Sequence, residues 1–275
     1  MTKKSAAKTT ASSSPDKLAA PEARWGRFLL DAAYQLWEIA VLTFVGALRS
    51  RRPEGELARQ LYQVGNRSLL FVLVTLGFTG MVLVFQSCLQ LSRVTGDLSQ
   101  VGGEFIKYLI HEFGPSLTAM MLATRVGAGI AAEIGSMVVT EQVDALRMCG
   151  VEPVEYLLVP RFLATQVMTL VLAVFGVLSA VLMGAFTAHQ TFHVPYAVFL
   201  DLSKVRLPDV LTGVLKALAY GAAIPIVSGF CGLRTHGGSE GVGWATTRAV
   251  VSSSFAVIVL DFLISALALL TWQAL

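Results

Sequence analysis

Long stretches without a charged residue constrain this chain more than any other feature. No Asp, Glu, Lys or Arg occurs between Arg67 and Arg93, a run of 25 residues, and a helix that crosses a bilayer needs about 20. Residues 162–200, 39 in all, also lack these four types. Only 14% of the 275 residues are charged, against about 25% in a soluble domain. The composition therefore excludes a soluble enzyme, a DNA-binding domain and a disordered chain.

The uncharged runs predict an all-α integral membrane protein with five transmembrane helices. A short loop containing Gly96, Asp97, Gly102 and Gly103 is expected between the first two spans, and residues 189–200 are expected at the far membrane surface. The expected spans cover residues 68–92, 113–132, 162–188, 210–233 and 249–275.

The first 52 residues differ in character from the rest. Residues 1–23 contain no apolar run and are expected to form a disordered cytoplasmic tail. In residues 24–52, polar side chains recur every three or four positions from Arg24 to Glu38, which favours an amphipathic helix lying in the membrane interface. A sixth span is the competing interpretation for this segment.

The distribution of positive charge predicts the orientation of the chain. Of its 21 Lys and Arg residues, 11 lie in residues 1–67. Positively charged segments stay on the cytoplasmic side, so the N-terminus is expected in the cytoplasm. Five spans then place the C-terminus outside, and loops 133–161 and 234–248 inside.

Small residues repeat every four positions in three of the expected spans, and such stripes let helices approach closely in lipid. Packing within one subunit and a seam between two subunits both fit this pattern. The stripes are Gly127, Ala131 and Gly135; Gly176, Ala180 and Gly184; and Gly213, Ala217 and Gly221.

A short helix is expected at residues 141–149, with Thr140 as its N-cap, Val143, Leu146 and Met148 as its apolar face, and Gly150 as a left-handed C-terminal cap. Nine residues make about 14 Å of helix, too little to cross a bilayer, so this helix must lie at the cytoplasmic surface. A solvated connector and a docking helix are both compatible with these residues.

Several ordered motifs resemble the MlaE/YrbE permease family, the membrane subunits of ABC transporters that move lipids between bacterial membranes. The resemblance covers residues 61–275, which we interpret as a permease domain. The motifs lie at 112–115 (Glu-Phe-Gly-Pro), 133–137 (Glu-Ile-Gly-Ser-Met), 140–146 (Thr-Glu-Gln-Val-Asp-Ala-Leu), 160–162 (Pro-Arg-Phe) and 241–251 (Gly-Val-Gly-Trp-Ala-Thr-Thr-Arg-Ala-Val-Val).

The resemblance implies a non-catalytic permease subunit in the bacterial inner membrane that moves phospholipid between the inner and outer membranes. The implied partners are a second copy of the chain, a cytoplasmic ATPase of the MlaF type and a periplasmic MCE-domain protein of the MlaD type. The chain has no G-x-x-x-x-G-K-[ST] motif, so ATP and Mg²⁺ would be bound by the ATPase. The resemblance assigns the docking role to the short helix, through Glu141, Gln142, Asp144, Ala145, Leu146, Arg147 and Gly150.

The resemblance also implies a lipid cavity formed between the two permease copies, near the first span and the helices around Glu112. An apolar lining suits acyl chains better than ions. At His111 this chain departs from the arginine that family members often carry. The expected lining residues are Phe71, Phe78, Val82, Phe85, His111, Glu112, Gly114 and Pro115.

Charged residues inside spans are costly and indicate function or specific pairing. We expect Asp261 to pair with a cation such as Arg125 or to accept hydrogen bonds from neighbouring hydroxyls. The long side chains of Arg125 and Lys216 could reach the interface. The alternative function is a nucleotide-independent secondary transporter or channel that uses Asp261 or Glu112.

Two other classes of site have little support. The Gly-x-Ser-x-Gly pattern around Ser239 lacks the strand-to-helix turn that a serine hydrolase requires. The four His residues are scattered, and the three Cys residues have no C-x-x-C spacing, so no metal site or disulfide framework is predicted.

Overall fold

A computed structural model describes residues 21–49, 55–94 and 98–273, and within these ranges it contains helices and no strand. The chain divides into two compact units, residues 1–38 and 39–275. The described part of the first unit is the beginning of α1 (Pro21–Arg49), whose remainder belongs to the second. Residues 21–23, expected in the tail, are helical, whereas residues 1–20 and 50–52 of the expected tail and interfacial helix lie outside the described residues.

In the described residues of the second unit, five helices are long and apolar enough to cross a membrane, which confirms the all-α membrane fold. The second of these, Val101–Val139, is made of five consecutive segments. The elements are α2 (Glu56–Val94), α3 (Val101–Tyr108), η2 (Leu109–Phe113), α4 (Gly114–Leu122), η3 (Ala123–Gly127), α5 (Ala128–Val139), α6 (Gln142–Met148), α7 (Pro153–Phe192), α8 (Tyr196–Phe199), α9 (Leu207–Leu233) and α10 (Gly238–Gln273).

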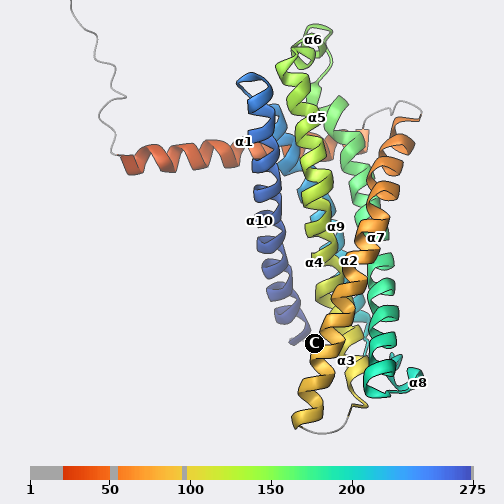
Figure 1. Cartoon of the computed structure of the whole chain (residues 1–275). Helices are drawn as coiled ribbons and strands as arrows, with labels where there is room; N and C mark the ends of the chain where they lie inside the picture. Colours follow the sequence, from red (N-terminus) through yellow and green to blue (C-terminus); the bar gives the residue numbers. More distant parts are fainter. Residues whose placement is uncertain (1–20, 50–54, 95–97, 274–275) are drawn as a thin grey trace, which may run out of the picture. The chain divides into compact units, whose positions relative to one another are not determined.

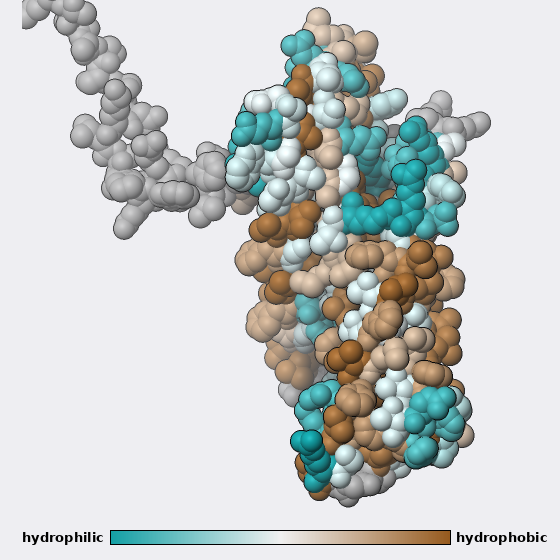
Figure 2. All heavy atoms as spheres, in the orientation of Figure 1, coloured by the Kyte–Doolittle hydropathy of each residue, from teal (hydrophilic) through white to brown (hydrophobic). Residues whose placement is uncertain are grey.

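The helices extend beyond the uncharged runs because helix formation does not stop where the hydrocarbon ends. Helix α2 begins at Glu56, well before Arg67, and α7 begins at Pro153 instead of near Phe162. Figure 2 shows the consequence on one face, where a brown hydrophobic band lies between teal hydrophilic residues at both ends. In Figure 1 these helices run side by side, and the most extensive packing joins α2 to α7.

The expected loop between the first two spans is shorter than predicted, because Gly102 and Gly103 lie inside α3. A Cβ at Gly102 would lie only 2.0 Å from the carbonyl oxygen of Phe199, so glycine lets α3 touch the α8 segment. The loop after α8 is held by Lys204, whose Nζ lies 3.0 Å from Oε1 of Glu104. In the same loop, hydrogen bonds from Ser203 keep the pKa of Asp201 below its usual value.

The small-residue stripes pack against helices of the same chain. A Cβ at Gly176 would lie 2.7 Å from Leu76 of α2, one at Gly213 would lie 2.3 Å from the carbonyl oxygen of Ile110, and one at Gly127 would lie 2.8 Å from Ser228 of α9. These approaches support the within-subunit interpretation of the stripes.

Candidate functional site

The helix α6 stands beyond the end of α5, at one end of the bundle (Figure 1). Its expected N-cap is wrong. The Thr140 hydroxyl donates to the carbonyl oxygen of Ser136 at 2.9 Å, and Thr140 is the C-cap residue of α5. Glu141 occupies the N-cap position instead, with a left-handed φ of 59° and no side-chain cap. Gly150 has a φ of 75°, as expected for the C-terminal cap, and Pro153 begins α7.

Most of α6 is exposed. Val143 is buried, and Leu146 packs partly buried against the main hydrophobic core. Met148 was expected on the same apolar face but is 89% exposed, because at about 100° per residue it lies about 140° from Val143 around the helix axis. Asp144 and Arg147 pair at 3.0 Å on the exposed side. The other expected docking residues, Glu141, Gln142, Ala145 and Gly150, are also exposed.

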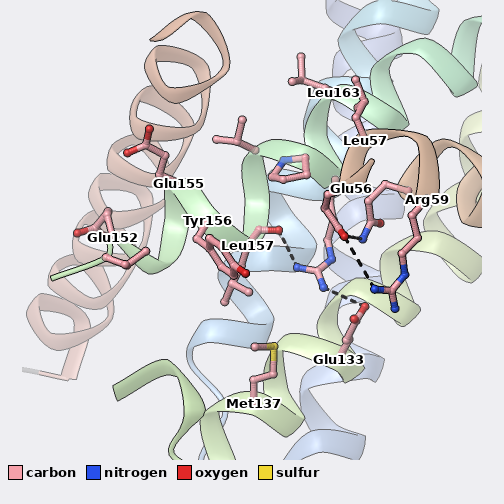
Figure 3. A pocket seen from close by; sticks show the side chains of 15 residues that line it. Glu56, Leu57, Arg59, Glu133, Met137, Glu152, Glu155, Tyr156, Leu157 and Leu163 are labelled. Carbon is pink, nitrogen blue, oxygen red and sulfur yellow. Dashed lines mark hydrogen bonds and ion pairs between the residues drawn. The ribbon is translucent and has the colours of Figure 1, made fainter. Parts of the chain in front are cut away.

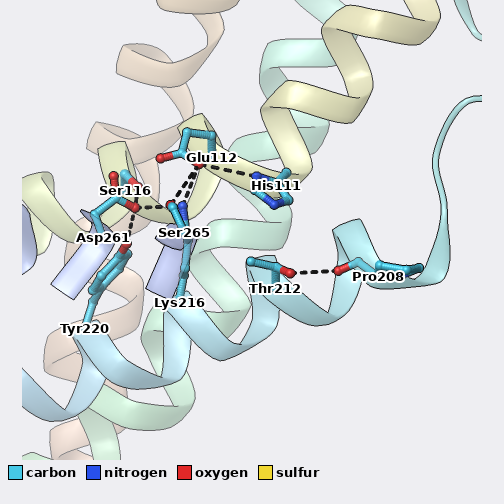
Figure 4. A network of polar contacts seen from close by, with 9 residues as sticks. All are labelled: His111, Glu112, Ser116, Pro208, Thr212, Lys216, Tyr220, Asp261 and Ser265. Carbon is cyan, nitrogen blue, oxygen red and sulfur yellow. Dashed lines mark hydrogen bonds and ion pairs between the residues drawn. The ribbon is translucent and has the colours of Figure 1, made fainter. Parts of the chain in front are cut away.

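A buried polar network joins three spans inside the bundle (Figure 4). The Lys216 side chain of α9 has no exposed surface, and its Nζ lies 2.6 Å from Oε2 of Glu112 and 2.8 Å from Oδ1 of Asp261. Glu112 comes from η2 and Asp261 from α10. One ammonium therefore sits between two carboxylates, which offsets the cost of burying the Lys216 charge, while the Glu112 and Asp261 side chains stay 33% and 24% exposed.

Neutral side chains complete this network. Ser116 donates to Oδ1 of Asp261 at 3.0 Å, and the Tyr220 hydroxyl donates to the same oxygen. Ser265 donates to Oε2 of Glu112 at 3.5 Å, and His111 Nδ1 lies 3.3 Å from that oxygen. Sequence reasoning missed Ser116, Tyr220 and Ser265. Each lies four residues after a buried charge on the same span, and that i,i+4 spacing was the available signal.

Asp261 pairs with a cation and accepts hydrogen bonds from hydroxyls, as expected, but the cation is not Arg125. Asp261 pairs with Lys216, whereas Arg125 donates through a guanidinium nitrogen to Oγ of Ser68 on α2. Lys216 also does not extend to the interface, since its side chain is fully buried. Glu112 lies in the π-helical segment η2 and Arg125 in the π-helical segment η3 of the second span, and such segments frequently occur at functional sites. Pro115 lacks an amide hydrogen, which accounts for the irregular turn before it.

The expected apolar cavity residues lie on the outer face of α2. Phe71, Phe78, Val82 and Phe85 are 45%, 61%, 65% and 41% exposed. Of the other expected lining residues, Gly114 and Pro115 are buried inside the chain, while His111 and Glu112 are partly exposed. These side chains do not enclose a cavity within this chain alone, so enclosure needs a covering surface from outside it.

A hollow of 520 Å³ that sequence reasoning missed lies where α2 and α7 begin and α5 ends (Figure 3). The buried Arg161 side chain reaches into this region, where one guanidinium nitrogen lies 3.0 Å from Oε2 of Glu133 and another donates to the carbonyl oxygen of Leu157. Glu56, Glu152 and Glu155 line the same hollow.

The described residues bear on two classes of site that the sequence did not favour, a serine hydrolase site and a metal site. Ser239 lies in the first turn of α10, and the described residues contain no strand before it, so the nucleophile-elbow geometry is absent there. No group of three or more His, Cys, Asp or Glu side chains in the described residues is placed to hold a metal ion.

Comparison with known proteins identifies the family. Residues 57–267 match the model of the family described as Permease MlaE. The chain is 35% identical over 224 residues to a probable ABC transporter permease protein of Synechocystis sp., covering 81% of this chain and 85% of that protein. It is 35% identical over 255 residues to a probable ABC transporter permease protein of Rickettsia typhi, covering 88% of this chain and 95% of that protein.

A plant protein is similar as well. The chloroplastic protein TRIGALACTOSYLDIACYLGLYCEROL 1 of Arabidopsis thaliana is 32% identical over 213 residues, covering 75% of this chain and 59% of the plant protein. The family match covers the buried network, α6 and the five membrane-spanning helices. This multi-pass membrane chain therefore belongs to the MlaE permease family, and its relatives from Synechocystis and Rickettsia typhi are named probable ABC transporter permeases.

Proposed function

We propose that this chain is the permease subunit of an ABC transporter that moves phospholipids between the inner and outer membranes of a bacterium. The observation that carries the proposal is the exposure of α6, which sits at one end of the bundle with Glu141, Gln142 and Ala145 uncovered. A chain without its own nucleotide-binding loop needs a surface to which a separate ATPase can bind. Helix α6 supplies it, and ATP and Mg²⁺ stay with the partner.

The proposed cargo follows from the outer face of α2. Its exposed Phe71, Phe78, Val82 and Phe85 form an apolar strip suited to acyl chains. The name of the chloroplast relative includes that of a galactolipid, which also points to lipid as the class of cargo. A second copy of this chain is the covering surface that we propose, because it would turn the strip into the wall of a cavity at the dimer interface.

The orientation and the remaining partner belong to the same proposal. The positive charge before the first span favours a cytoplasmic N-terminus and a periplasmic C-terminus in the inner membrane, which leaves α6 on the side of the ATPase. The α8 end then faces the periplasm, where a protein of the MCE type would receive or deliver lipid.

Co-purification of the ATPase with a tagged chain tests this proposal. Glu141→Lys reverses a charge at an exposed position and keeps a side chain at the same left-handed φ, so folding should be unaffected while ATPase recovery falls. Glu141→Gln is the matched control and should retain the ATPase. Leu146→Asp is a poorer probe of docking because Leu146 packs against the core. Full recovery with Glu141→Lys, or no ATPase with the unmodified chain, would contradict the proposal.

A second candidate is a nucleotide-independent secondary transporter. The specific observation in its favour is the pairing of Glu112 and Asp261 with the buried Lys216, since carboxylates inside a bundle can carry protons. Transport by the purified chain in proteoliposomes, driven by a pH gradient without nucleotide, would support this candidate and contradict the ATP-driven one.

A further inference from the structure

A second hollow of 370 Å³ lies beside the one in Figure 3 and shares Gln60, Glu133 and Arg161 with it. Its wall contains three arginines and a single carboxylate. We call it the arginine hollow. Its lining residues are Gln60, Gln63, Val64, Arg67, Arg125, Val126, Gly129, Ile130, Glu133 and Arg161.

The three arginines differ in whether a carboxylate pairs with their guanidinium group. Arg161 is buried and neutralised by Glu133. Arg125 has a hydrogen bond to the neutral Ser68 hydroxyl, and in the described part of the chain neither Arg125 nor Arg67 has a carboxylate within ion-pair distance. Arg67 also lies close enough for its charge to act on Arg125. Two like charges that converge without a counter-ion indicate a place for an anion.

The depth of the arginine hollow in the membrane matches that of a lipid phosphate group. Arg67 is the residue directly before the 25-residue uncharged run of α2, so it lies where the hydrocarbon ends and the headgroup layer begins. Gln60 and Gln63 add amide groups that can donate hydrogen bonds to phosphate oxygens.

The hollow is also aligned with the apolar strip. At about 100° per residue, Phe71, Phe78, Val82 and Phe85 all lie within about 60° of the direction of Arg67 around α2. One face of α2 therefore carries an arginine at the headgroup level and exposed apolar side chains along the hydrocarbon. An amphiphile with a phosphate at one end and acyl chains at the other matches both parts.

We propose that the arginine hollow binds the phosphate group of a phospholipid, with Arg67 and Arg125 as its principal ligands and the acyl chains lying along the Phe71 to Phe85 strip. This inference rests on the proposed function, which it extends by giving the headgroup a site. A free phosphate ion offers the same oxygens, and the experiment has to separate the two sources.

The test measures the binding of dioleoyl phosphatidylglycerol and of dioleoylglycerol, which lacks the phosphate, to the purified full chain in detergent with its co-purifying partners. We expect Arg125→Gln and Arg67→Gln each to weaken phosphatidylglycerol binding by about tenfold and to leave dioleoylglycerol binding unchanged. Arg93→Gln removes an exposed arginine from the other end of α2 and should change neither. An equal effect on both lipids, or no effect on either, would overturn the proposal.

A steric variant tests the same site without removing charge. A Cβ at Gly129 meets no atom within 4 Å, so Gly129→Leu should fold and fill the hollow, with loss of phosphatidylglycerol binding. Gly243→Leu is the matched control, since a Cβ at Gly243 also meets open space. Unchanged phosphatidylglycerol binding by Gly129→Leu would contradict the site.

Competition with inorganic phosphate tells whether the hollow binds a lipid phosphate or a free phosphate ion. At millimolar concentration it should displace little phosphatidylglycerol, because it lacks the acyl chains. Complete displacement, together with arginine-dependent binding of phosphate itself, would assign the hollow to free phosphate and overturn the lipid assignment. A wild-type chain that binds neither lipid would contradict the proposed function, whereas lipid binding that is independent of Arg67 and Arg125 contradicts only the site.

Discussion

Nζ of Lys216 lies 2.6 Å from Oε2 of Glu112, a residue 104 positions earlier in the chain. This contact ties α9 to the second span in the interior of the bundle, where Lys216 has no exposed surface. Asp261 completes the pairing from α10. The position of one lysine therefore depends on three separate membrane-spanning segments.

Removing this lysine should be strongly destabilising. Lys216→Met leaves two carboxylates without their cation, and breaking a buried ion pair costs about 3–5 kcal/mol. The free energy of unfolding, measured by SDS titration in micelles, should fall by about this amount. Lys107→Met, at a partly exposed position of α3, should have little effect. Equal stability of the Lys216 and Lys107 variants would show that the network does not stabilise the bundle.

The double variant Lys216→Met with Glu112→Gln should recover part of the lost stability. Glu112→Gln removes one of the two uncompensated charges, so the two substitutions should be less than additive by about 0.5–3 kcal/mol. The same SDS titrations give this coupling energy. Strict additivity would indicate that the two side chains do not interact.

The turn after α6 depends on glycine for its backbone conformation. Gly150 has a φ of 75°, and a Cβ there meets no atom within 4 Å, so Gly150→Ala should cost about 1 kcal/mol through the left-handed backbone alone. Gly129→Ala, also with open space but inside a helix, should instead stabilise by about 0.5–1 kcal/mol. Thermal unfolding in detergent measures both, and a change of the same sign would contradict the explanation.

The contact between α2 and α7 requires a glycine at position 80. A Cβ there would lie 2.5 Å from the carbonyl oxygen of Ala180, and backbone atoms cannot move aside as a side chain can. Gly80→Ala should therefore destabilise by about 1–3 kcal/mol, despite the higher helix propensity of alanine. Thermal unfolding that shows a gain in stability would mean that the two helices are not packed this closely.

Cysteine accessibility tests the proposed orientation. Cys149, directly after α6, is exposed, whereas Cys88 is buried in α2. An impermeant maleimide should modify Cys149 only after the inner membrane is opened, and a cysteine introduced at exposed Leu202 should react once the outer membrane is permeable. A C88S/C231S background removes the other thiols. Modification of Cys149 in cells with an intact inner membrane would reverse the assigned topology.

The spans could be predicted from the sequence because hydrocarbon excludes charge, so the run between Arg67 and Arg93 leaves few alternatives. The residues at which the helices begin and end could not be predicted in this way. Residues 56–67 are polar enough for water, yet they continue α2, because a helix already formed is extended at little cost. The cap of α6 was missed for another local reason, since Thr140 is the C-cap of α5 and Glu141 takes the N-cap position with a left-handed φ.

The candidate sites were harder to predict because they depend on which spans are neighbours. The sequence indicated that Asp261 needs a cation, but choosing Lys216 over Arg125 requires knowing that α9 and α10 pack together. Likewise, the apolar side chains of α2 were recognised, but periodicity does not distinguish a face toward lipid from a face toward a cavity. The arginine hollow joins residues from α2, the second span and α7, and no local pattern connects them.

ATP-dependent phospholipid transfer tests the central claim most directly. The wild-type chain and Glu141→Lys would be reconstituted into liposomes at equal amounts with the ATPase that co-purifies with the wild type, and the movement of a fluorescent phospholipid followed with and without ATP. We predict movement that requires ATP hydrolysis and is lost in Glu141→Lys. Equal movement without nucleotide, or undiminished ATP-driven movement by Glu141→Lys, would contradict the claim that an external ATPase acts through α6.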